Sequence, residues 1–258
     1  PLMTKTPHPR AIEAATKYFL IQAAASATIL FSSTINAWLT GEWAINNLSH
    51  PAANITLTLA LAMKLGLAPV HFWLPEVLQG LTLQTGLILS TWQKLAPMAL
   101  LIQLADTTNL ILLMTIGITS TLLGGWGGIN QTQLRKIMAF SSIAHIGWMV
   151  TVLKFAPNIS LLNLLIYLLM TTAMFTTMIS LATKKISDLA TAWPKTPTLT
   201  ALSMLTLLSL GGLPPLSGFM PKWLIAQELI KQNLMAFATM ILLSTLLSLF
   251  FYLRLAYI

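Results

Sequence analysis

The sequence has no cysteine and very little charge. Only six of its 258 residues are acidic, and charged residues make up 8% of the total. The absence of cysteine excludes a disulfide framework, a cysteine-ligated zinc site and a thiolate cluster. A soluble domain carries about 25% charged residues, so this chain has too few charges to cover a surface that faces water. The composition therefore excludes an ordinary soluble globular protein.

Apolar residues take the place of the missing charges. They account for 56% of the chain, and the mean hydropathy is +0.78. These values indicate an all-α polytopic membrane protein, because a helix of about 20 apolar residues spans a bilayer. We expect residues 1–258 to form a single transmembrane domain. The chain begins with Pro1 and ends inside the apolar run FFYLRLAYI (250–258), so we expect a fragment that lacks sequence at both ends.

Apolar runs between polar or Pro/Gly-rich breaks predict about eight transmembrane helices. They cover roughly residues 10–33, 54–74, 82–103, 107–127, 133–153, 158–183, 198–230 and 234–258. The longest predicted loops cover residues 34–53 and 184–197. An even number of crossings places both ends of the chain on the same side of the membrane.

Basic residues fall mainly on one side of this predicted topology. Nine of the 14 lie on the side of the first chain end: Lys5, Arg10, Lys17, Arg135, Lys136, Lys184, Lys185, Lys195 and Arg254. Only Lys154 and Lys231 lie on the opposite side. This asymmetry is the positive-inside pattern, which places the first side in the cytoplasm or its organellar equivalent. Loop solvation and topology account for the net charge of +8, so the charge does not indicate a surface that binds nucleic acid.

The remaining three lysines lie at membrane depth. They are Lys64 in LALAMKLGLAPVHFWLP (59–75), Lys94 in LILSTWQKLAPMA (87–99) and Lys222 in GFMPKWLIAQE (218–228). A lysine near a helix end usually extends its amine to the interface. That alternative stays more open for Lys222 than for Lys64 and Lys94, which lie about ten residues, or some 15 Å, from either predicted end. Desolvation disfavours the charged amine and a nearby carboxylate favours it, so buried lysines are candidates for a proton relay.

His145 is a fourth candidate for the relay. It lies in the middle of LRKIMAFSSIAHIGWMV (134–150), and an imidazole titrates in the range that a proton path requires. A histidine that is only hydrogen-bonded inside the bundle is an equally good interpretation. Asn163, Tyr167 and Thr171 can hold water between spans, although hydrogen bonding between helices is the commoner use of such residues.

Carboxylates are absent from the middle of the predicted spans. The acidic residues lie in connections or within a turn of span ends: Glu13, Glu42, Glu76, Asp106, Asp188 and Glu228. Sodium prefers hard oxygen ligands, and the middle of the spans offers no carboxylate for a sodium site. We expect an acid partner of Lys64 to come from missing sequence or from another subunit.

Two predicted spans carry an interruption beside a lysine. The span 198–230 would measure about 50 Å as one helix, against a hydrocarbon core of about 30 Å. In its segment LGGLPPLSG (210–218), Gly211 and Gly212 loosen the backbone, and Pro214 and Pro215 remove hydrogen-bond donors. The second span has a similar feature in LGLAP (65–69), with Gly66 and Pro69. We predict non-helical backbone near residues 66–70 and 211–216, which water can reach.

The two interrupted spans are five helices apart, so they cross the membrane in opposite directions. Paired Gly/Pro-interrupted segments in corresponding positions of two halves point to a transport site. Two unrelated proline kinks would give the same pattern. We interpret the pair as inverted five-helix repeats.

Four stretches of the sequence resemble a known family. They are MKLGLAPVHFWLPEVLQG (63–80), TWQKLAP (91–97), GGWGGINQTQLRKIMAFSSIAHIGWM (124–149) and LSLGGLPPLSGFMPKW (208–223). These motifs are similar to those of the antiporter-like membrane subunits of mitochondrial respiratory complex I, the NADH:ubiquinone oxidoreductase. The resemblance covers essentially the whole chain. It implies the mitochondrial inner membrane, with the basic loops facing the matrix.

The resemblance also implies a role for the lysines. In that family, quinone reduction elsewhere in the complex is coupled to proton movement through a chain of midplane lysines. By motif, Lys64 matches the lysine that pairs with a glutamate, Lys94 the central lysine, and Lys222 the lysine towards the neighbouring antiporter-like subunit. The family's glutamate lies in a Gly-Leu-Glu context upstream of the first residue here, so no residue of this chain matches it.

The expected partners are the other membrane subunits of the complex and the lipid bilayer. No cofactor is expected on this chain, because flavin, iron–sulfur clusters and ubiquinone would belong to other subunits. Two other functions stay open. A free-standing cation/proton antiporter would share the broken helices but normally requires a midplane carboxylate, and a purely structural subunit would need no buried lysines. The sequence favours a proton-relaying subunit that carries no redox group and does not act alone.

Overall fold

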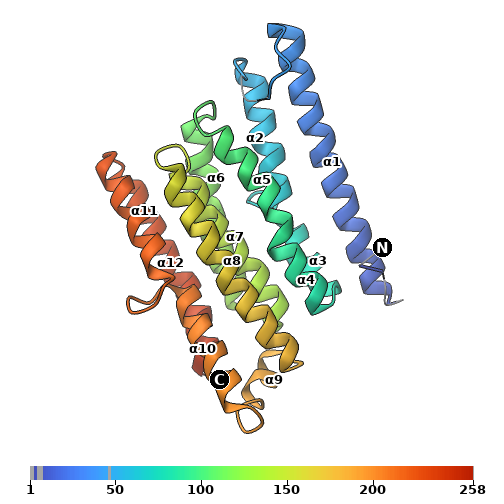
Figure 1. Ribbon diagram of the computed structural model, residues 1–258, viewed down its shortest axis with the longest axis vertical. Helices are drawn as coiled ribbons and strands as arrows, with labels where there is room; N and C mark the ends of the chain where they lie inside the picture. The colour runs from blue at the N-terminus through green and yellow to red at the C-terminus, as the bar shows by residue number, and fades with distance from the viewer. Residues whose placement is uncertain (1–2, 5–7, 46–47, 258) are drawn as a thin grey trace.

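The computed structural model describes residues 3–4, 8–45 and 48–257. Within these residues the secondary structure is helical, apart from one isolated antiparallel bridge between Gln133 and Lys185. The helices are α1 (Pro9–Thr40), α2 (Pro51–Leu65), α3 (Trp73–Gly80), α4 (Leu83–Ser90), α5 (Trp92–Gln103), α6 (Leu110–Ile129), α7 (Leu134–Val152), α8 (Pro157–Ser180), α9 (Ile186–Ala190), α10 (Pro197–Gly211), α11 (Phe219–Lys231) and α12 (Met235–Tyr257). They form one elongated bundle, with α1 at one edge and α11 and α12 at the other (Figure 1). The predicted all-α class is confirmed.

In the part of the chain that the structure describes, four helices are long and apolar enough to cross a membrane, namely α1, α6, α8 and α12. α2 and α10 are also apolar but have only 15 residues each. They are short because the chain leaves the helical conformation and then resumes it, as α3 after α2 and as α11 after α10. The predicted spans 54–74, 82–103 and 198–230 are therefore each divided between shorter helices.

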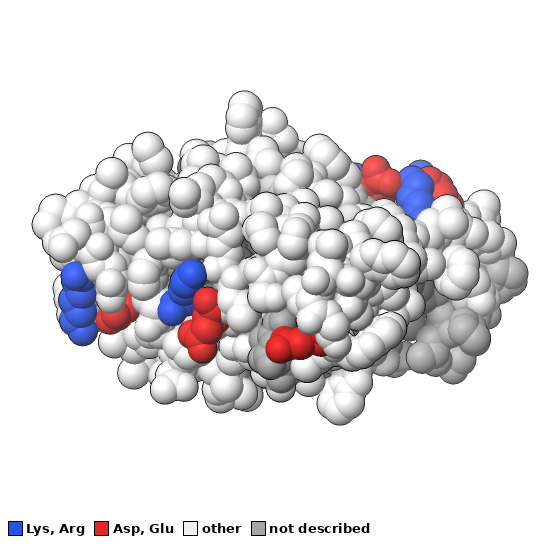
Figure 2. Space-filling model, turned by 90° about the horizontal axis from the view of Figure 1, so that it is seen from above, with Lys and Arg blue, Asp and Glu red and all other residues white. Residues whose placement is uncertain are grey.

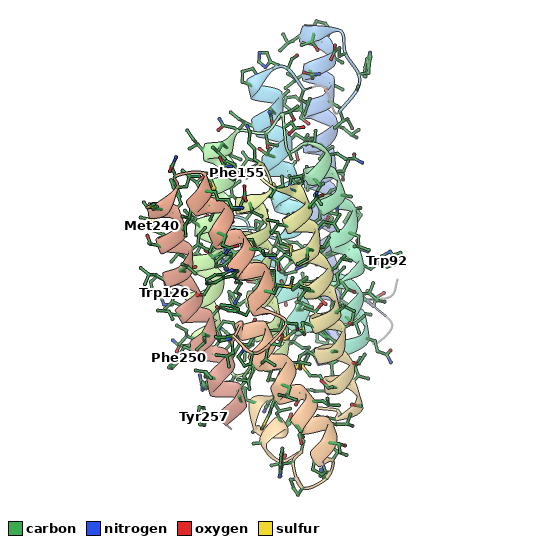
Figure 3. All side chains as sticks on the ribbon, turned by 60° about the vertical axis from the view of Figure 1, so that its left-hand side comes forward. Trp92, Trp126, Phe155, Met240, Phe250 and Tyr257 are labelled. Atoms are coloured by element: carbon green, nitrogen blue, oxygen red, sulfur yellow. The ribbon has the colours of Figure 1, made fainter. Side chains whose placement is uncertain are left out.

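The outer surface of the bundle is strongly apolar. Along one long side, Trp126, Met240, Phe250 and Tyr257 project away from the helices, and Trp92 projects from the opposite side (Figure 3). Trp126 is 70% exposed and Met240 is 55% exposed. The view along the bundle shows only a few charged side chains on an otherwise uncharged surface (Figure 2). Apolar surface of this extent is costly in water but not in a bilayer.

α1 is longer than the sequence predicted. The prediction ended it at residue 33 and assigned residues 34–53 to a loop, but the helix continues to Thr40. It stops at Gly41, whose φ of +76° is the left-handed conformation that ends helices. No glycine or proline interrupts residues 34–40, so nothing stops the helix earlier. The loop that remains ends at Pro51, which opens α2.

The predicted loop 184–197 also contains structure, since α9 lies within it. The carboxylate of Asp188 accepts hydrogen bonds from the backbone N–H groups of Lys184 at 3.0 Å and Lys185 at 2.9 Å. These bonds hold the pKa of the Asp188 carboxyl below its ordinary value. An acidic side chain three residues after the helix cap is a known helix-start signal, and the sequence analysis overlooked it here.

The basic segments gather at one end of the bundle. In Figure 1, α9 and the end of α12 lie at the lower end of the bundle, and α1 begins at its own lower end. The bridge between Gln133 and Lys185 ties the start of α7 to α9. These segments carry Arg10, Lys17, Arg135, Lys136, Lys184, Lys185, Lys195 and Arg254. Lys5 lies outside the described residues. The side of the membrane that this end faces stays a prediction.

α6 and α7 approach each other closely at glycines. A Cβ built on Gly124 would lie 2.8 Å from the backbone nitrogen of Ala144 and 3.0 Å from the carbonyl oxygen of Phe140. A Cβ on Gly147 would lie 2.9 Å from the carbonyl oxygen of Gly117. Small residues commonly allow such approaches between membrane helices. They help to enclose α7, nearly all of whose residues are buried.

We predict that Gly124→Ala lowers the unfolding temperature of the protein in its native assembly. The added methyl would meet backbone of α7, which cannot rotate aside as a side chain can, and such overpacking costs about 1–3 kcal/mol. Gly211→Ala is the matched control, because its methyl would have its nearest neighbour at 3.6 Å, on Tyr252. Equal unfolding temperatures for the two variants would contradict this account of the packing.

Candidate functional site

The first helix interruption covers residues 66–72, between α2 and α3. Gly66 ends α2 with a φ of +78°. The N–H of Ala68 donates to Ser120 Oγ on α6 at 3.0 Å, and the indole of Trp73 donates to the Met63 carbonyl at 3.2 Å. Pro69 contributes no donor. The predicted break at 66–70 is therefore present and extends two residues further, with backbone groups paired inside the protein.

Lys64 lies in the last turn of α2, just before this break. Its side chain is half-buried, so the expectation of a buried lysine at this position holds only in part. Its own carbonyl accepts a hydrogen bond from Gln22 on α1 at 3.4 Å. The C-terminal end of a helix carries partial negative charge, which favours a cation at this position.

The second interruption covers residues 212–218, between α10 and α11. Gly212 ends α10 with a φ of +81°, and the N–H of Gly218 donates to Ser209 Oγ at 3.2 Å. Pro214 and Pro215 lie within the break, whereas Gly211 is still helical. The prediction of residues 211–216 is therefore confirmed, with a shift of one to two residues. The chain runs from α2 to α3 in one direction and from α10 to α11 in the other (Figure 1).

A third interruption, at Thr91, was not predicted. It separates α4 from α5 three residues before Lys94. The hydroxyls of Ser90 and Thr91 both donate to the Leu87 carbonyl, at 3.0 and 2.7 Å. Hydroxyls that bond back to the preceding turn bend helices, and the Ser-Thr pair was the available signal in the sequence.

Lys94 is buried against Tyr167 of α8. Lys94 is 3% exposed. Its amine donates to the Tyr167 hydroxyl at 3.3 Å and lies 5.2 Å from the centroid of the Tyr167 ring. The hydroxyl in turn donates to the Ser90 carbonyl at 3.3 Å, directly at the third interruption. The Tyr167 ring also lies against His145 of α7. The tyrosine thus connects the lysine to two other helices.

His145 lies on α7 between Tyr167 and the second break. Its ring centroid is 5.5 Å from that of Tyr167, and the residue is 8% exposed. The backbone carbonyl of Leu210, in the last turn of α10, lies beside the imidazole. The histidine is therefore adjacent to Tyr167 on one side and to the end of α10 on the other.

Lys222 reaches the same end of α10 from the first turn of α11. Its amine donates to the carbonyls of Gly211 at 2.8 Å and Leu210 at 3.4 Å. A cavity of about 10 Å³ lies beside it, lined by Ala144, His145, Trp148, Lys222, Ser248 and Tyr252. This is about the volume needed for one water molecule. The Tyr252 hydroxyl is hydrogen-bonded to Ser141.

The structure thus brings three of the four predicted relay residues together. We call Lys94, Tyr167, His145 and Lys222 the central polar line. Lys64 lies apart from it, because Leu61, Leu65 and Leu67 pack with Met98 and Leu101 in one apolar cluster between α2 and α5. In the sequence, Tyr167 was considered as a residue that holds water or forms hydrogen bonds between helices. Tyr252 and Ser248 were overlooked because single polar residues in an apolar helix carry no pattern.

No carboxylate pairs with these lysines among the described residues. The ion pairs there join Lys17 to Glu13 and Glu76, both at 2.6 Å, and Lys231 to Glu228 at 3.5 Å. The same residues include no cluster of ligands suited to a metal ion. The central polar line can accept and pass protons through an amine, a phenol and an imidazole, and its chemistry contains no redox group.

Comparison with known proteins places the chain in a family. Residues 2–248 match the family described as "NADH:quinone oxidoreductase/Mrp antiporter, TM", and the chain belongs to this family of transmembrane subunits. The chain is 68% identical to NADH-ubiquinone oxidoreductase chain 2 of Xenopus laevis over 258 residues, covering 100% of this chain and 75% of that protein. It is 66% identical to the chain of the same name from Salmo salar over 257 residues, covering 100% and 74%.

Solved structures show the same fold. A chain of respiratory complex I from Thermus thermophilus with bound aureothin is similar with a TM-score of 0.90 and 30% identity. The match covers 99% of this chain and 61% of that one. A chain of the Mrp complex from Dietzia sp. DQ12-45-1b is similar in fold, with a TM-score of 0.84 and 19% identity over 96% of this chain and 50% of the other.

Proposed function

We propose that this chain is a proton-relaying membrane subunit of NADH:ubiquinone oxidoreductase, the enzyme after which its relatives are named. The observation that carries this proposal is the central polar line, which links two buried amines through a phenol and an imidazole. Redox chemistry belongs to other subunits, and quinone reduction there is coupled to proton movement here. The chain relays protons and does not catalyse a reaction alone.

In this proposal, protons move along the central polar line in short steps. The Lys94 ammonium passes a proton to the Tyr167 oxygen, which it contacts at 3.3 Å, as the hydroxyl turns away from the Ser90 carbonyl and releases its own proton to His145. His145 lies next, against the Tyr167 ring and on the wall of the cavity that it shares with Lys222. Water in the cavity beside Lys222 completes the path to the second amine. Two ammonium groups in one poorly solvated line repel each other, so the arrival of a proton at one lysine favours its departure from the other.

Lys64 acts as a separate gate at the start of the line. It is half-buried at the end of α2 and has no carboxylate partner among the described residues. We infer that an acid from outside this chain controls its charge. When the acid is close, the ammonium form is favoured; when the acid is neutral or distant, the proton moves on towards Lys94.

The same proposal defines how the chain lies in the membrane. α1, α6, α7, α8 and α12 each cross it once, and the pairs α2–α3, α4–α5 and α10–α11 cross it as broken helices, which gives eight spans. The opposed directions of α2–α3 and α10–α11, each with a left-handed glycine next to a lysine, support inverted repeats. The membrane is the mitochondrial inner membrane, the basic end faces the matrix, and the partners are the other membrane subunits, including a neighbouring antiporter-like subunit.

Changing Lys94 to Met removes the titrating group but keeps the length and apolarity of the side chain. We expect the complex to assemble, while NADH-driven proton translocation falls by about tenfold or more, since a proton-transferring group typically contributes about 10²–10⁴-fold. Lys231→Met is the control, because Lys231 is 71% exposed in a surface ion pair that contributes little. Normal translocation by an assembled Lys94→Met complex would show that the lysine only fills space.

Substitution of Lys64 tests the gate separately. Lys64→Arg should impair translocation nearly as much as Lys64→Met, because a guanidinium group keeps its charge but does not release its proton near neutral pH. The measurement is NADH-driven proton uptake in membranes with matched amounts of assembled complex. If arginine restores what methionine loses, Lys64 provides a fixed charge and the gate is wrong.

A further inference from the structure

The ammonium group of Lys222 is compensated by a helix end. Its amine donates to the carbonyls of Gly211 and Leu210 at 2.8 and 3.4 Å. These carbonyls belong to the last turn of α10, where carbonyls lack helical partners and the helix carries partial negative charge. Since the described ion pairs do not include Lys222, the end of α10 occupies the place that a carboxylate usually takes.

Gly212 creates the space through which Lys222 reaches these carbonyls. A Cβ built on Gly212 would lie 2.8 Å from Nζ, 2.9 Å from Cδ and 3.1 Å from Cε of Lys222. The lysine stem therefore runs directly over this glycine. The φ of +81° at the same residue ends α10 and leaves its last carbonyls unpaired. Gly212 thus leaves the last carbonyls of α10 open as acceptors and gives the Lys222 amine room to reach them.

A small cavity adjoins the Lys222 amine. The cavity beside the amine is lined by His145 from α7 and by Tyr252 and Ser248 from α12. His145 and Tyr252 are the titratable groups that face Lys222 from these helices. α8 contributes Tyr167 on the far side of His145, and α10 has no titratable side chain.

We propose that Gly212 is a positioning residue that holds the Lys222 ammonium on the open carbonyls of α10, so that a broken helix stabilises the proton-loaded lysine in place of a carboxylate. Unloading breaks one N–H bond of the ammonium, and the proton passes by way of a water molecule in the cavity to form an N–H bond on the His145 imidazole. Lys222 is left as a neutral amine with a lone pair, and the reverse transfer reloads it. This inference rests on the proposed relay.

The test is Gly212→Ala in the assembled complex, with the pH dependence of NADH-driven proton translocation as the readout. The methyl should displace the amine from the carbonyls and weaken proton binding by Lys222. The pH of half-maximal translocation should then move down by about one unit, because loss of one hydrogen bond to a charged group changes an equilibrium by about tenfold or more. Lowering the pH should therefore partly restore translocation.

Two further variants separate this effect from backbone strain. Gly41→Ala adds the same methyl at a left-handed residue with a φ of +76° and no atom within 4 Å of the added carbon, and it should leave the pH profile unchanged. Gly212→Asn keeps a Cβ over the lysine, while asparagine tolerates the left-handed conformation. It provides the same test if Gly212→Ala does not assemble, and it should shift the profile in the same direction.

The Lys222→Met variant distinguishes this inference from the proposed function. If Lys222→Met leaves translocation intact, the relay itself is wrong. If Lys222→Met abolishes translocation but both Gly212 variants keep the normal pH profile, only the positioning role of Gly212 is wrong. Combining Gly212→Ala with Lys222→Met should lower translocation no further than Lys222→Met alone. A further decrease would show that Gly212 does not act through Lys222.

Discussion

A positive charge buried in a bilayer must be solvated by the protein itself, and this chain does so with carbonyls and hydroxyls. Lys222 lies on two carbonyls at the end of α10, and Lys94 lies against a tyrosine hydroxyl. The same solution recurs at both ends of the bundle, where basic side chains donate to carbonyls that end helices or loops: Lys154 to Thr108, Arg135 to Leu81 and Arg254 to Ile129. With six acidic residues in 258, few carboxylates are available for this purpose.

This constraint explains why a helix is broken beside Lys222. A continuous helix uses its carbonyls internally, whereas an interruption leaves the last turn free to accept hydrogen bonds from a cation. Each interruption near a lysine is held by hydroxyls: Ser120 at the first, Ser209 at the second, and Ser90 and Thr91 at the third. The close packing of α6 and α7 then encloses His145 next to the second break. Acceptors, amines and imidazole are fixed relative to one another without an acidic residue.

The sequence alone predicted the features that follow from composition and backbone chemistry. Glycine and proline located two interruptions to within two residues, because these residues remove donors or adopt conformations that other residues avoid. The third interruption was missed, because two back-bonding hydroxyls bend a helix only when the rotamers allow it. The end of α1 was placed too early, since a change in polarity is a weaker stop signal than Gly41. Tyr167 and Tyr252 acquire their roles from neighbours on other helices, which no local pattern contains.

The central claim is that Lys94 and Lys222 belong to one proton path. A double-mutant cycle tests it most directly, using NADH-driven proton translocation by assembled complexes that carry Lys94→Met, Lys222→Met or both. Residues that act as one unit are strongly non-additive, so the double variant should lose no more translocation than the more severe single variant. If the losses of the two single variants instead multiply in the double variant, the lysines act independently, and a single path through Tyr167 and His145 is contradicted.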